Sequence, residues 1–450
     1  MLAPNAQNPL LTGPILPTLM RLSLPNMGAM VATSLVAIAE TSYVGALGTP
    51  ALAGLALVFP FVMLQQMMSG GAMGGGVSSS IARALGGGEV QRASSLALHA
   101  SFIGLCAGLA LAAMLFAFGP ALFAALGGRD AALAEAIAYA RVYSVAVLFV
   151  WMTNTLASVV RGCGNMRVPS ATIFVAAIAQ IVVGGALGLG LGGLPRLGMA
   201  GVATGQVAAY GGSAAFLAWF LLAGRARVKP KLTAFAPDGA LFRDILRVGG
   251  LACISPIQTV ATVLILTRLI AHFGTSALAG YGIGSRLEFL LIPIAFAIGV
   301  ACVPMVGMAI GADDVPRARR VAWSGGLVSA VMLGVVGLFF AIFPHLWSRM
   351  FTSDAGVLES ARLYLVWSGL AYFFYGLGLC LYFASQGAGK VLGPVIAGTV
   401  RLAVVIAGGL WLASWDAPQW MMFVVVALSM TAYGLATAGF VWITPWGKKA

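Results

Sequence analysis

The chain of 450 residues is 60% hydrophobic and 8% charged, with a formal net charge of +13 and a mean hydropathy of +0.99. Soluble domains are about 45–50% apolar and about 25% charged, so this composition excludes an ordinary soluble protein and indicates a membrane protein. The basic residues lie in short segments between apolar runs, which indicates membrane topology rather than nucleic-acid binding.

A bilayer core of about 30 Å needs about 20 mostly apolar residues per helix, and the sequence has twelve stretches of this kind. In the first half they span residues 18–46, 53–82, 94–118, 134–158, 168–191 and 199–222. In the second half they span residues 242–272, 279–309, 319–343, 360–384, 393–413 and 420–442. The segment between the halves, Gly224–Lys231, is the most basic interior stretch. The sequence therefore predicts an N-terminal lobe (1–222), a basic cytoplasmic linker (223–239) and a C-terminal lobe (240–450).

The two halves repeat each other. Gly48–Gly54 recurs as Gly274–Gly280, at an offset of 226 (274 − 48), and Gly162-Cys-Gly164 recurs as Gly387-Ala-Gly389, at an offset of 225 (387 − 162). Between these anchors, the pattern of Gly86, Val90, Arg92 and Ala93 recurs as Gly311, Val315, Arg317 and Ala318. Because six helices per half is an even number, both halves enter the membrane in the same direction. We expect an all-α integral membrane protein of two parallel six-helix bundles, related by a pseudo-twofold axis along the membrane normal.

The orientation follows from the loops. Lys and Arg gather in the loops after even-numbered helices and in the C-terminal tail, whereas loops after odd-numbered helices hold little beyond Arg129, Arg196 and Arg349. We therefore expect a multi-pass protein of the inner (plasma) membrane with both termini cytoplasmic. The residues up to Pro17 have no charged segment and no cleavage site, so we expect no signal peptide.

Of the twelve acidic residues, only Glu40 and Glu288 fall well inside expected helices. A charge at mid-membrane costs about 2.5–3.5 kcal/mol on insertion scales, so such residues usually serve a function. Burial disfavours the ionised form of Glu40, which lets it take up and release a proton, and Pro25 earlier in the same helix removes a backbone hydrogen bond and provides a hinge. We expect Glu40 to be the ion-coupling residue. The alternative is a structural carboxylate held by neighbouring hydroxyls and amides.

Two other groups of side chains are candidates for function. Glu288 and Arg286 are two residues apart, so they do not face each other on a helix, and either can reach a partner on another helix, for example Arg401. A structural network and a substrate or ion role remain open for this pair. The second expected helix carries Phe61 and Met67 in a run of Met, Gln and aromatic residues, a composition found in adaptable binding surfaces and also in simple packing.

Catalytic and cofactor motifs were not found in the sequence. The three histidines are dispersed, the five cysteines form no CxxC pair, and no Walker sequence occurs. We therefore expect no enzymatic activity, no metal site and no cofactor other than a proton or sodium ion as the coupling ion.

The stretch Glu40–Gly54 resembles the signature of the first two helices of MATE (multidrug and toxic compound extrusion) transporters. The stretches Arg161–Asn165, Leu197–Gly201 and Tyr281–Glu288 resemble the same family, and the resemblance covers nearly the whole chain. It implies export of organic, often cationic, compounds in exchange for inward protons or sodium ions, by alternating access of two six-helix bundles. The family's first-helix acid and proline fall on Glu40 and Pro25.

The sequence departs from the family at other acids. The fifth-helix Asp of one branch falls on Gly184, with Gln180 in the place of its Asn partner, and the acids of the seventh and tenth helices fall on Thr259 and Tyr375. The resemblance thus leaves one matched coupling acid. Sodium needs several oxygen ligands, which Glu40 gathers only with amides or hydroxyls such as Gln180 or Asn154, so protons are favoured. The candidate cavity residues are Gln180, Asn154, Tyr375, Gln258, Glu288, Arg286, Met67 and Phe61.

We expect the protein to be a secondary active antiporter that exports small organic compounds, and to act as a monomer in contact with membrane lipid and without nucleic acid. The alternative is a lipid-linked oligosaccharide flippase of the same superfamily. A flippase needs a strongly basic cavity for pyrophosphate, whereas the bases expected in the membrane are limited to candidates such as Arg286 and Arg401.

Overall fold

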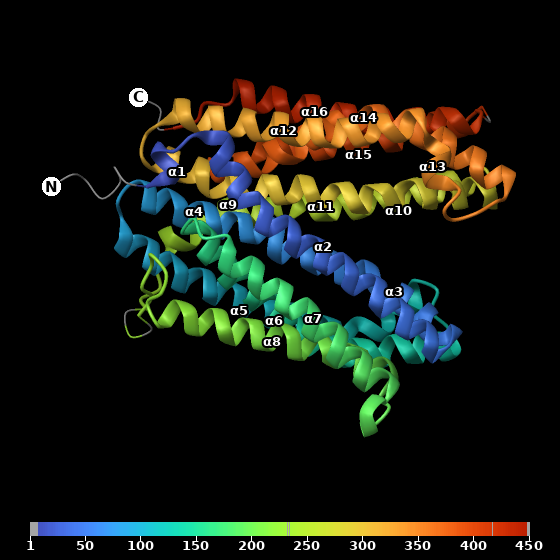
Figure 1. Ribbon diagram of the computed structural model, residues 1–450, viewed down its shortest axis with the longest axis horizontal. Helices are drawn as coiled ribbons and strands as arrows, with labels where there is room; N and C mark the ends of the chain where they lie inside the picture. The colour runs from blue at the N-terminus through green and yellow to red at the C-terminus, as the bar shows by residue number, and fades with distance from the viewer. Residues whose placement is uncertain (1–7, 232, 234, 416, 448–450) are drawn as a thin grey trace. The chain divides into compact units, whose positions relative to one another are not determined.

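The computed structural model describes residues 8–231, 233, 235–415 and 417–447, which fold into helices (Figure 1). In the first half these are α1 (Pro9–Thr12), α2 (Ile15–Leu47), α3 (Thr49–Gln66), a π-helix (Met67–Met73), α4 (Gly74–Gly86), α5 (Val90–Ala125), α6 (Asp130–Gly162), α7 (Arg167–Leu189), a 3₁₀ turn (Leu191–Gly193) and α8 (Gly198–Leu222). In the second half they are α9 (Gly239–Ala252), α10 (Ile254–Ala271), α11 (Thr275–Gly311), α12 (Val315–Ile342), α13 (Pro344–Ser348), α14 (Ala355–Gly387), α15 (Leu392–Ala413) and α16 (Gln419–Ile443).

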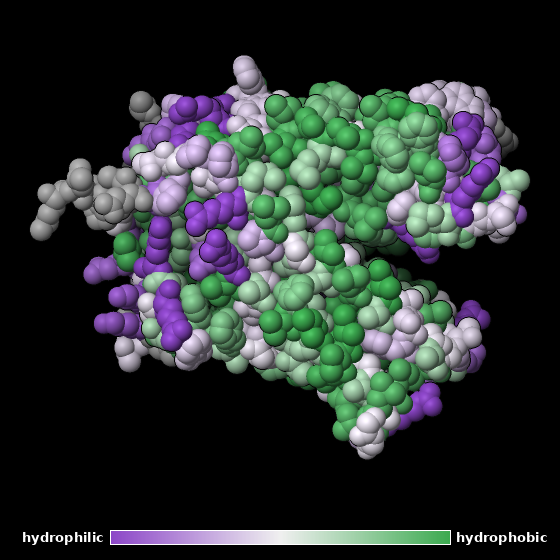
Figure 2. Space-filling view, in the orientation of Figure 1, coloured by the Kyte–Doolittle hydropathy of each residue, from purple (hydrophilic) through white to green (hydrophobic). Residues whose placement is uncertain are grey.

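Within the described residues, twelve segments are long and apolar enough to cross a membrane, which confirms the twelve predicted helices. Two are composite: Thr49–Gly86 joins α3, the π-helix and α4, and Gly239–Ala271 joins α9 and α10. Apolar side chains cover the middle of the helices and polar ones gather near the helix ends (Figure 2). Large apolar groups such as Ile38 and Phe118, 66% and 67% exposed, are suited to contact with lipid tails.

The internal repeat is also present in the helix boundaries. The first residues of α5 and α12 differ in number by 225 (315 − 90), as do those of α6 and α14 (355 − 130) and of α7 and α15 (392 − 167). The last residues of α6 and α14, the repeated Gly162 and Gly387, show the same difference (387 − 162). The repeated sequence anchors therefore mark equivalent turns between equivalent helices.

The described helices form two compact units, Met1–Ser23 with Gly250–Ala450, and Leu24–Gly249. These bounds differ from the predicted lobes, because residues 8–23 belong with the second half and residues 240–249 with the first. In the unit that contains Gly250–Ala450, Arg317 holds the N-terminal segment by two hydrogen bonds. Its Nε donates to the carbonyl of Leu10 (3.1 Å) and its Nη2 to that of Gly13 (2.6 Å). Leu19 is completely buried in the same unit.

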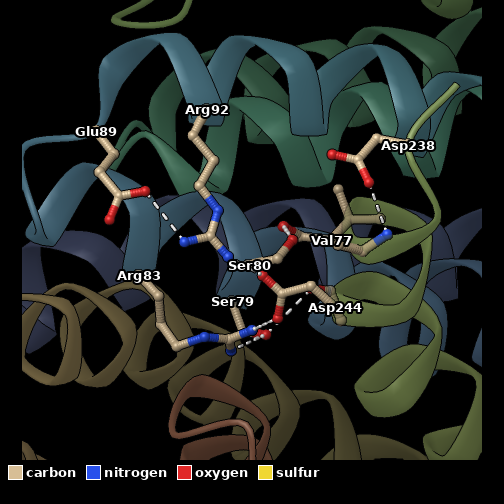
Figure 3. Close-up of polar contacts among 10 residues, drawn as sticks. Val77, Ser79, Ser80, Arg83, Glu89, Arg92, Asp238 and Asp244 are labelled. Carbon is tan, nitrogen blue, oxygen red and sulfur yellow. Dashed lines mark hydrogen bonds and ion pairs between the residues drawn. The ribbon is translucent and has the colours of Figure 1, made fainter. Parts of the chain in front are cut away.

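In the unit Leu24–Gly249, α9 is attached by ion pairs near the helix ends (Figure 3). Asp244 of α9 accepts from Arg83 Nη2 (2.6 Å) and from Arg92 Nη2 (3.3 Å), which come from α4 and α5. Glu89 accepts from the other terminal nitrogen of Arg92 (3.1 Å). Further along α9, Gly249 lies against Gly76 of α4: a Cβ on Gly76 would lie 2.5 Å from the Cα of Gly249. Because neither residue has a side chain, the two helix backbones are in direct contact.

The end of the predicted linker is held against α5 by His99. The backbone N–H of Asp238 donates to His99 Nε2 (3.0 Å), while His99 Nδ1 lies 2.8 Å from the carbonyl oxygen of Ser95. The rings of Phe235 and Phe242 pack against the imidazole, with centroids 5.2 and 4.6 Å away. The linker thus continues into α9 as a packed segment.

Small residues bring helix backbones together within each unit. A Cβ on Gly205 of α8 would lie 2.6 Å from the Cα of Gly184 on α7, and a Cβ on Gly434 of α16 would lie 2.2 Å from the carbonyl oxygen of Phe374 on α14. Lipid tails provide no hydrophobic force between helices, so close van der Waals contact at such positions is the main source of packing energy.

We expect Gly434→Ala to lower the thermal unfolding midpoint of the purified protein, because the new methyl group overlaps the Phe374 carbonyl; overpacking of this kind costs about 1–3 kcal/mol. Gly439→Ala on the same helix is the matched control, since nothing lies within 4 Å of its added Cβ. The control should be neutral or slightly stabilising. Equal midpoints for the two variants would show that the α14–α16 contact is not tight.

We expect Asp244→Asn to loosen α9, because the amide keeps the shape of the carboxylate but loses its charge attraction to Arg83 and Arg92. A partly exposed ion pair contributes up to about 1 kcal/mol, so hydrogen exchange of the α9 amides should become about two- to fivefold faster. Glu89→Gln is the control, since Glu89 bonds to Arg92 and does not hold α9. Unchanged exchange in the Asp244 variant would mean that apolar packing alone fixes the helix.

Candidate ion-coupling and substrate site

Glu40 of α2 lies inside the unit Leu24–Gly249, with 8% of its surface exposed. Its Oε1 accepts hydrogen bonds from two amides, Gln180 Nε2 of α7 (2.7 Å) and Gln206 Nε2 of α8 (3.4 Å). Gln206 Nε2 also donates to the hydroxyl of Tyr139 on α6 (2.6 Å). The carboxylate therefore lies where four helices meet and points away from lipid.

The close packing of α7 on α8 places the two amide donors. Gly184 and Gly205 let the helices touch, and a Cβ on Gly205 would lie 2.8 Å from the backbone carbonyl of Gln180. A larger residue at either glycine would separate α7 from α8 and move Gln180 away from Gln206. The glycines thus act on the site through backbone spacing, without contacting the carboxylate.

Glu40 has no charged partner: none of the ion pairs among the described residues includes it. Glutamine amides are neutral, so they satisfy lone pairs of the carboxylate and leave its charge uncompensated. A buried group in this position can become neutral only by taking up a proton or by binding a cation. The geometry is suited to reversible cation binding.

Tyr43 lies beside Gly184, where the MATE resemblance places an acid in other family members. A Cβ on Gly184 would lie 3.3 Å from the Tyr43 hydroxyl and 3.2 Å from the carbonyl of Val202. The phenol of α2 therefore takes the space next to α7 that a longer side chain at residue 184 would need. This packing explains how the bundle accommodates the missing acid.

The aromatic neighbours of the site include one predicted residue. Tyr139 and Tyr143, one turn apart on α6, stack with ring centroids 5.7 Å apart, and Phe61 of α3 meets Tyr143 edge-on at 6.5 Å. Sequence reasoning identified Phe61 but missed Tyr43, Tyr139 and Gln206. The intramembrane amide of Gln206 was the available signal, because an amide in an apolar helix needs a partner.

Asn154 belongs to a second polar group of the same unit. Its Nδ2 donates to Gln66 Oε1 (3.1 Å) and to Ser69 Oγ (2.8 Å), and Gln66 Nε2 donates to the Tyr210 hydroxyl. These contacts lie where α3 passes into the π-helix that begins at Met67, and π-helical turns occur often at functional sites. The structure thus joins Gln180 directly to Glu40 and gives Asn154 other partners.

The four candidates of the second half have four different direct partners within the unit that contains Gly250–Ala450. Glu288 accepts from the Tyr364 hydroxyl, whereas the guanidinium of Arg286 lies 5.2 Å from the ring centroid of Phe351. Gln258 Nε2 donates to Thr399 Oγ1 (2.8 Å). Arg286 and Glu288 therefore diverge, as their spacing on a helix predicts.

Tyr375 is paired with Arg401. The guanidinium of Arg401 lies 4.9 Å from the ring centroid of Tyr375, and Nη1 is 3.4 Å from its hydroxyl. No ion pair among the described residues joins Arg401 to Glu288. The direct partner of each group is therefore a tyrosine of α14, and Arg401 lies near Glu288 without forming a direct ion pair with it.

Pro25 lies inside α2, which continues unbroken from Ile15 to Leu47. The boundary between the two compact units falls between Ser23 and Leu24, immediately before this proline. The missing hydrogen bond at Pro25 thus coincides with the place where α2 leaves one unit for the other. Its role as a hinge stays a prediction.

Metal ligands do not gather anywhere in the described part of the chain, where no three His, Cys, Asp or Glu side chains are placed to hold an ion.

Cys163, in the turn between α6 and α7, is 4% exposed, and burial raises the pKa of its thiol to about 11. This thiol is therefore largely protonated at neutral pH and weakly nucleophilic.

The twelve membrane-spanning helices and the duplicated halves are those of a membrane transporter built from two related bundles. The MatE family model matches residues 25–184 and again residues 252–411, so the chain belongs to the MATE family of transporters and is a multi-pass membrane protein.

Similar proteins include two named probable multidrug resistance protein NorM. That of Thermotoga maritima is 27% identical over 381 residues, covering 84% of this chain and 81% of that protein. That of Deinococcus radiodurans is 29% identical over 421 residues, covering 87% and 86%. A FAD transporter of Shewanella oneidensis is 25% identical over 378 residues, covering 84% and 82%.

Among solved structures, a MOP superfamily transporter from Pyrococcus furiosus superposes with a TM-score of 0.88 at 22% identity, covering 96% of each chain. A MATE transporter from Vibrio cholerae superposes with a TM-score of 0.87 at 20% identity, covering 95% of this chain and 96% of that one. These structures show the same fold over nearly the whole chain.

We expect Gln180→Leu to destabilise the protein more than Gln206→Leu when both are made in a Tyr139→Phe background, in which Gln206 has lost its other partner. Gln180 makes the shorter hydrogen bond to Glu40. Removing a donor from a buried charged group costs about 1.5–3 kcal/mol, which a lower thermal unfolding midpoint in detergent would report. The two substitutions are chemically the same, so each is the control for the other. The opposite order would assign the main support of the carboxylate to Gln206.

Proposed function

We propose that this protein exports small organic compounds, including cations, from the cytoplasm in exchange for inward protons, and that Glu40 carries the coupling proton. The observation that carries the proposal is the environment of Glu40: a buried carboxylate held by two neutral amides, with no basic partner among the described residues. The multidrug resistance names of the two NorM relatives support organic compounds as the substrates.

The donors around Glu40 favour a proton over sodium. Gln180 and Gln206 both direct amide nitrogens at the carboxylate, so they donate N–H groups to it. A sodium ion instead needs several oxygen atoms directed at one point, and a repulsive N–H group in the ligand shell weakens its binding. A proton needs only one carboxylate oxygen.

Proton uptake changes what the site can hold. The ionised carboxylate attracts an organic cation and accepts from both amides, whereas the neutral acid loses that attraction and gains an O–H donor. Binding of proton and cation at this position is therefore mutually exclusive. Exclusive binding gives exchange when the site faces each side of the membrane in turn.

We propose further that both termini are cytoplasmic and that a single chain in the inner membrane suffices for transport, with lipid as its surroundings. The basic loops after even-numbered helices support this orientation. The flippase alternative gains no support from Arg286 and Arg401, whose guanidinium groups lie over the rings of two different residues, Phe351 and Tyr375.

We expect Glu40→Gln to abolish proton-coupled transport. In everted membrane vesicles with a preset pH gradient, an organic cation such as ethidium should dissipate the gradient with wild-type protein and not with the variant. Glu359→Gln is the control, because Glu359 is exposed and paired with Arg362 at the start of α14. It should behave like wild type.

A second arm replaces the pH gradient with a sodium gradient at constant pH. Ethidium transport driven by the sodium gradient alone would reject the proton as the coupling ion. Equal exchange in wild type and Glu40→Gln would reject Glu40 as its carrier.

A further inference from the structure

The second buried carboxylate, Glu288, lies deep in α11. It follows Thr275, the first residue of the helix, by 13 positions (288 − 275), which places it about 20 Å along the helix axis. Its carboxylate accepts from the hydroxyl of Tyr364 on α14, a side chain that is 1% exposed. Glu288 as a whole is partly exposed, and the direct partner of its carboxylate is a neutral hydroxyl.

The titratable groups facing Glu288 are tyrosines and one base. Tyr281 of α11 and Tyr364 and Tyr372 of α14 surround it, and Arg401 faces it from α15. Arg401 makes its contact with Tyr375, which follows Tyr364 by 11 positions (375 − 364), about 16 Å along α14. The positive charge of Arg401 therefore attracts the ionised carboxylate of Glu288 from a distance. It does not form a direct ion pair, which would oppose protonation of the carboxylate.

The two intramembrane acids meet equivalent tyrosines of the repeat. Tyr139 and Tyr364 are related by the offset of 225 (364 − 139), and each follows the first residue of its helix by the same interval (139 − 130 and 364 − 355). Tyr139 shares the amide of Gln206 with Glu40, and Tyr364 donates directly to Glu288. Each unit thus has an intramembrane carboxylate linked to this tyrosine position, through an amide in one unit and directly in the other.

The acids themselves come from helices that are not equivalent. By the two offsets of the repeat, 225 and 226, Glu40 corresponds to Ile265 or Leu266, and Glu288 corresponds to Met63 or Val62, all of them apolar. The acid near this tyrosine position therefore comes from α2 in one unit and from α11 in the other. A carboxylate within a membrane-spanning helix is costly, which favours a role for Glu288 over incidental placement.

We propose that Glu288 is a second proton-binding site, which takes up and releases a proton during the transport cycle. One proton from water adds to one carboxylate oxygen and later returns to water, so no other reactant is needed. The ligand is a proton because the guanidinium of Arg401, which offers no lone pair and carries a positive charge, faces the carboxylate and disfavours a metal cation there. The part of this proposal that links Glu288 to transport rests on the proposed proton coupling. The part that says Glu288 binds a proton is independent of it.

Infrared difference spectroscopy during a pH titration of the purified protein in lipid tests protonation without substrate. The wild type should show carbonyl bands of protonated carboxyl groups, and Glu288→Gln should lose a different component from the one that Glu40→Gln loses. Glu359→Gln should lose neither. Tyr364→Phe should shift the Glu288 component to higher frequency, because the carboxyl group loses a hydrogen-bond donor.

Proton release on addition of ethidium, measured with a pH dye in weak buffer, tests the link to transport. Glu288→Gln should release about half as many protons as the wild type, since each acid accounts for one of two coupled sites. Glu288→Asp should restore release, whereas a purely structural role would give the same result for Gln and Asp variants of equal thermal stability.

An infrared titration identical in Glu288→Gln and wild type would overturn the proposal, whatever Glu40 does. A lost Glu288 band with unchanged proton release would overturn its part in transport. Loss of the Glu288 band while Glu40→Gln still exchanges protons would uphold the second site and reject the Glu40 assignment, so the two failures are distinguishable.

Discussion

The cost of burying a carboxylate in a low-dielectric medium is the constraint on which the site depends. The ion pairs of the described residues, Arg83–Asp244, Arg92–Asp244, Arg92–Glu89 and Arg362–Glu359, join side chains that are between 18% and 55% exposed. Glu40 is instead held inside a unit by neutral amides. A charge without a counter-charge costs about 2.5–3.5 kcal/mol at mid-membrane, and neutralisation by a proton removes that cost. The same environment that destabilises the ionised form thus makes the group responsive to pH.

The partners of Glu40 are positioned by glycines, which have no functional side chain. Gly184 and Gly205 set the spacing of α7 and α8, and through it the separation of Gln180 from Gln206. In an apolar solvent, packing energy depends on how closely backbones approach, so a site between helices requires small residues near it. The abundance of glycine in this sequence is part of how its polar groups are brought together.

The class of fold was predictable from the sequence because its signals are local. Span length, apolar composition and the nearly constant offset between the repeats predicted twelve helices in two related halves, and Glu40 was singled out as an acid in an apolar run. The predicted helix 242–272 is two helices, since α9 ends at Ala252 and α10 begins at Ile254. The sequence also did not reveal that residues 8–23 pack with the second half, because long-range packing leaves no periodic signal.

The partners of the acids were less predictable. Most helices here are apolar on every face, so periodicity does not show which side points inward. Gln180 was found because it takes the place of a family amide, whereas Gln206 and Tyr139 required the rotation of α8 and α6 to be known. Arg401 was the partner that charge suggested for Glu288, yet the phenol of Tyr364 is its direct partner. Charge complementarity alone is a weak guide where neutral donors are closer.

The duplicated halves retain a frame and differ in what they place on it. Tyr139 and Tyr364 occupy the same turn of equivalent helices, while Glu40 and Glu288 come from α2 and α11. α2 passes from one compact unit to the other next to Pro25, whereas α11 lies wholly within one unit. The two proposed proton sites therefore differ in their place in the fold: Glu40 lies on a helix with residues in both units, and Glu288 lies on a helix within a single unit.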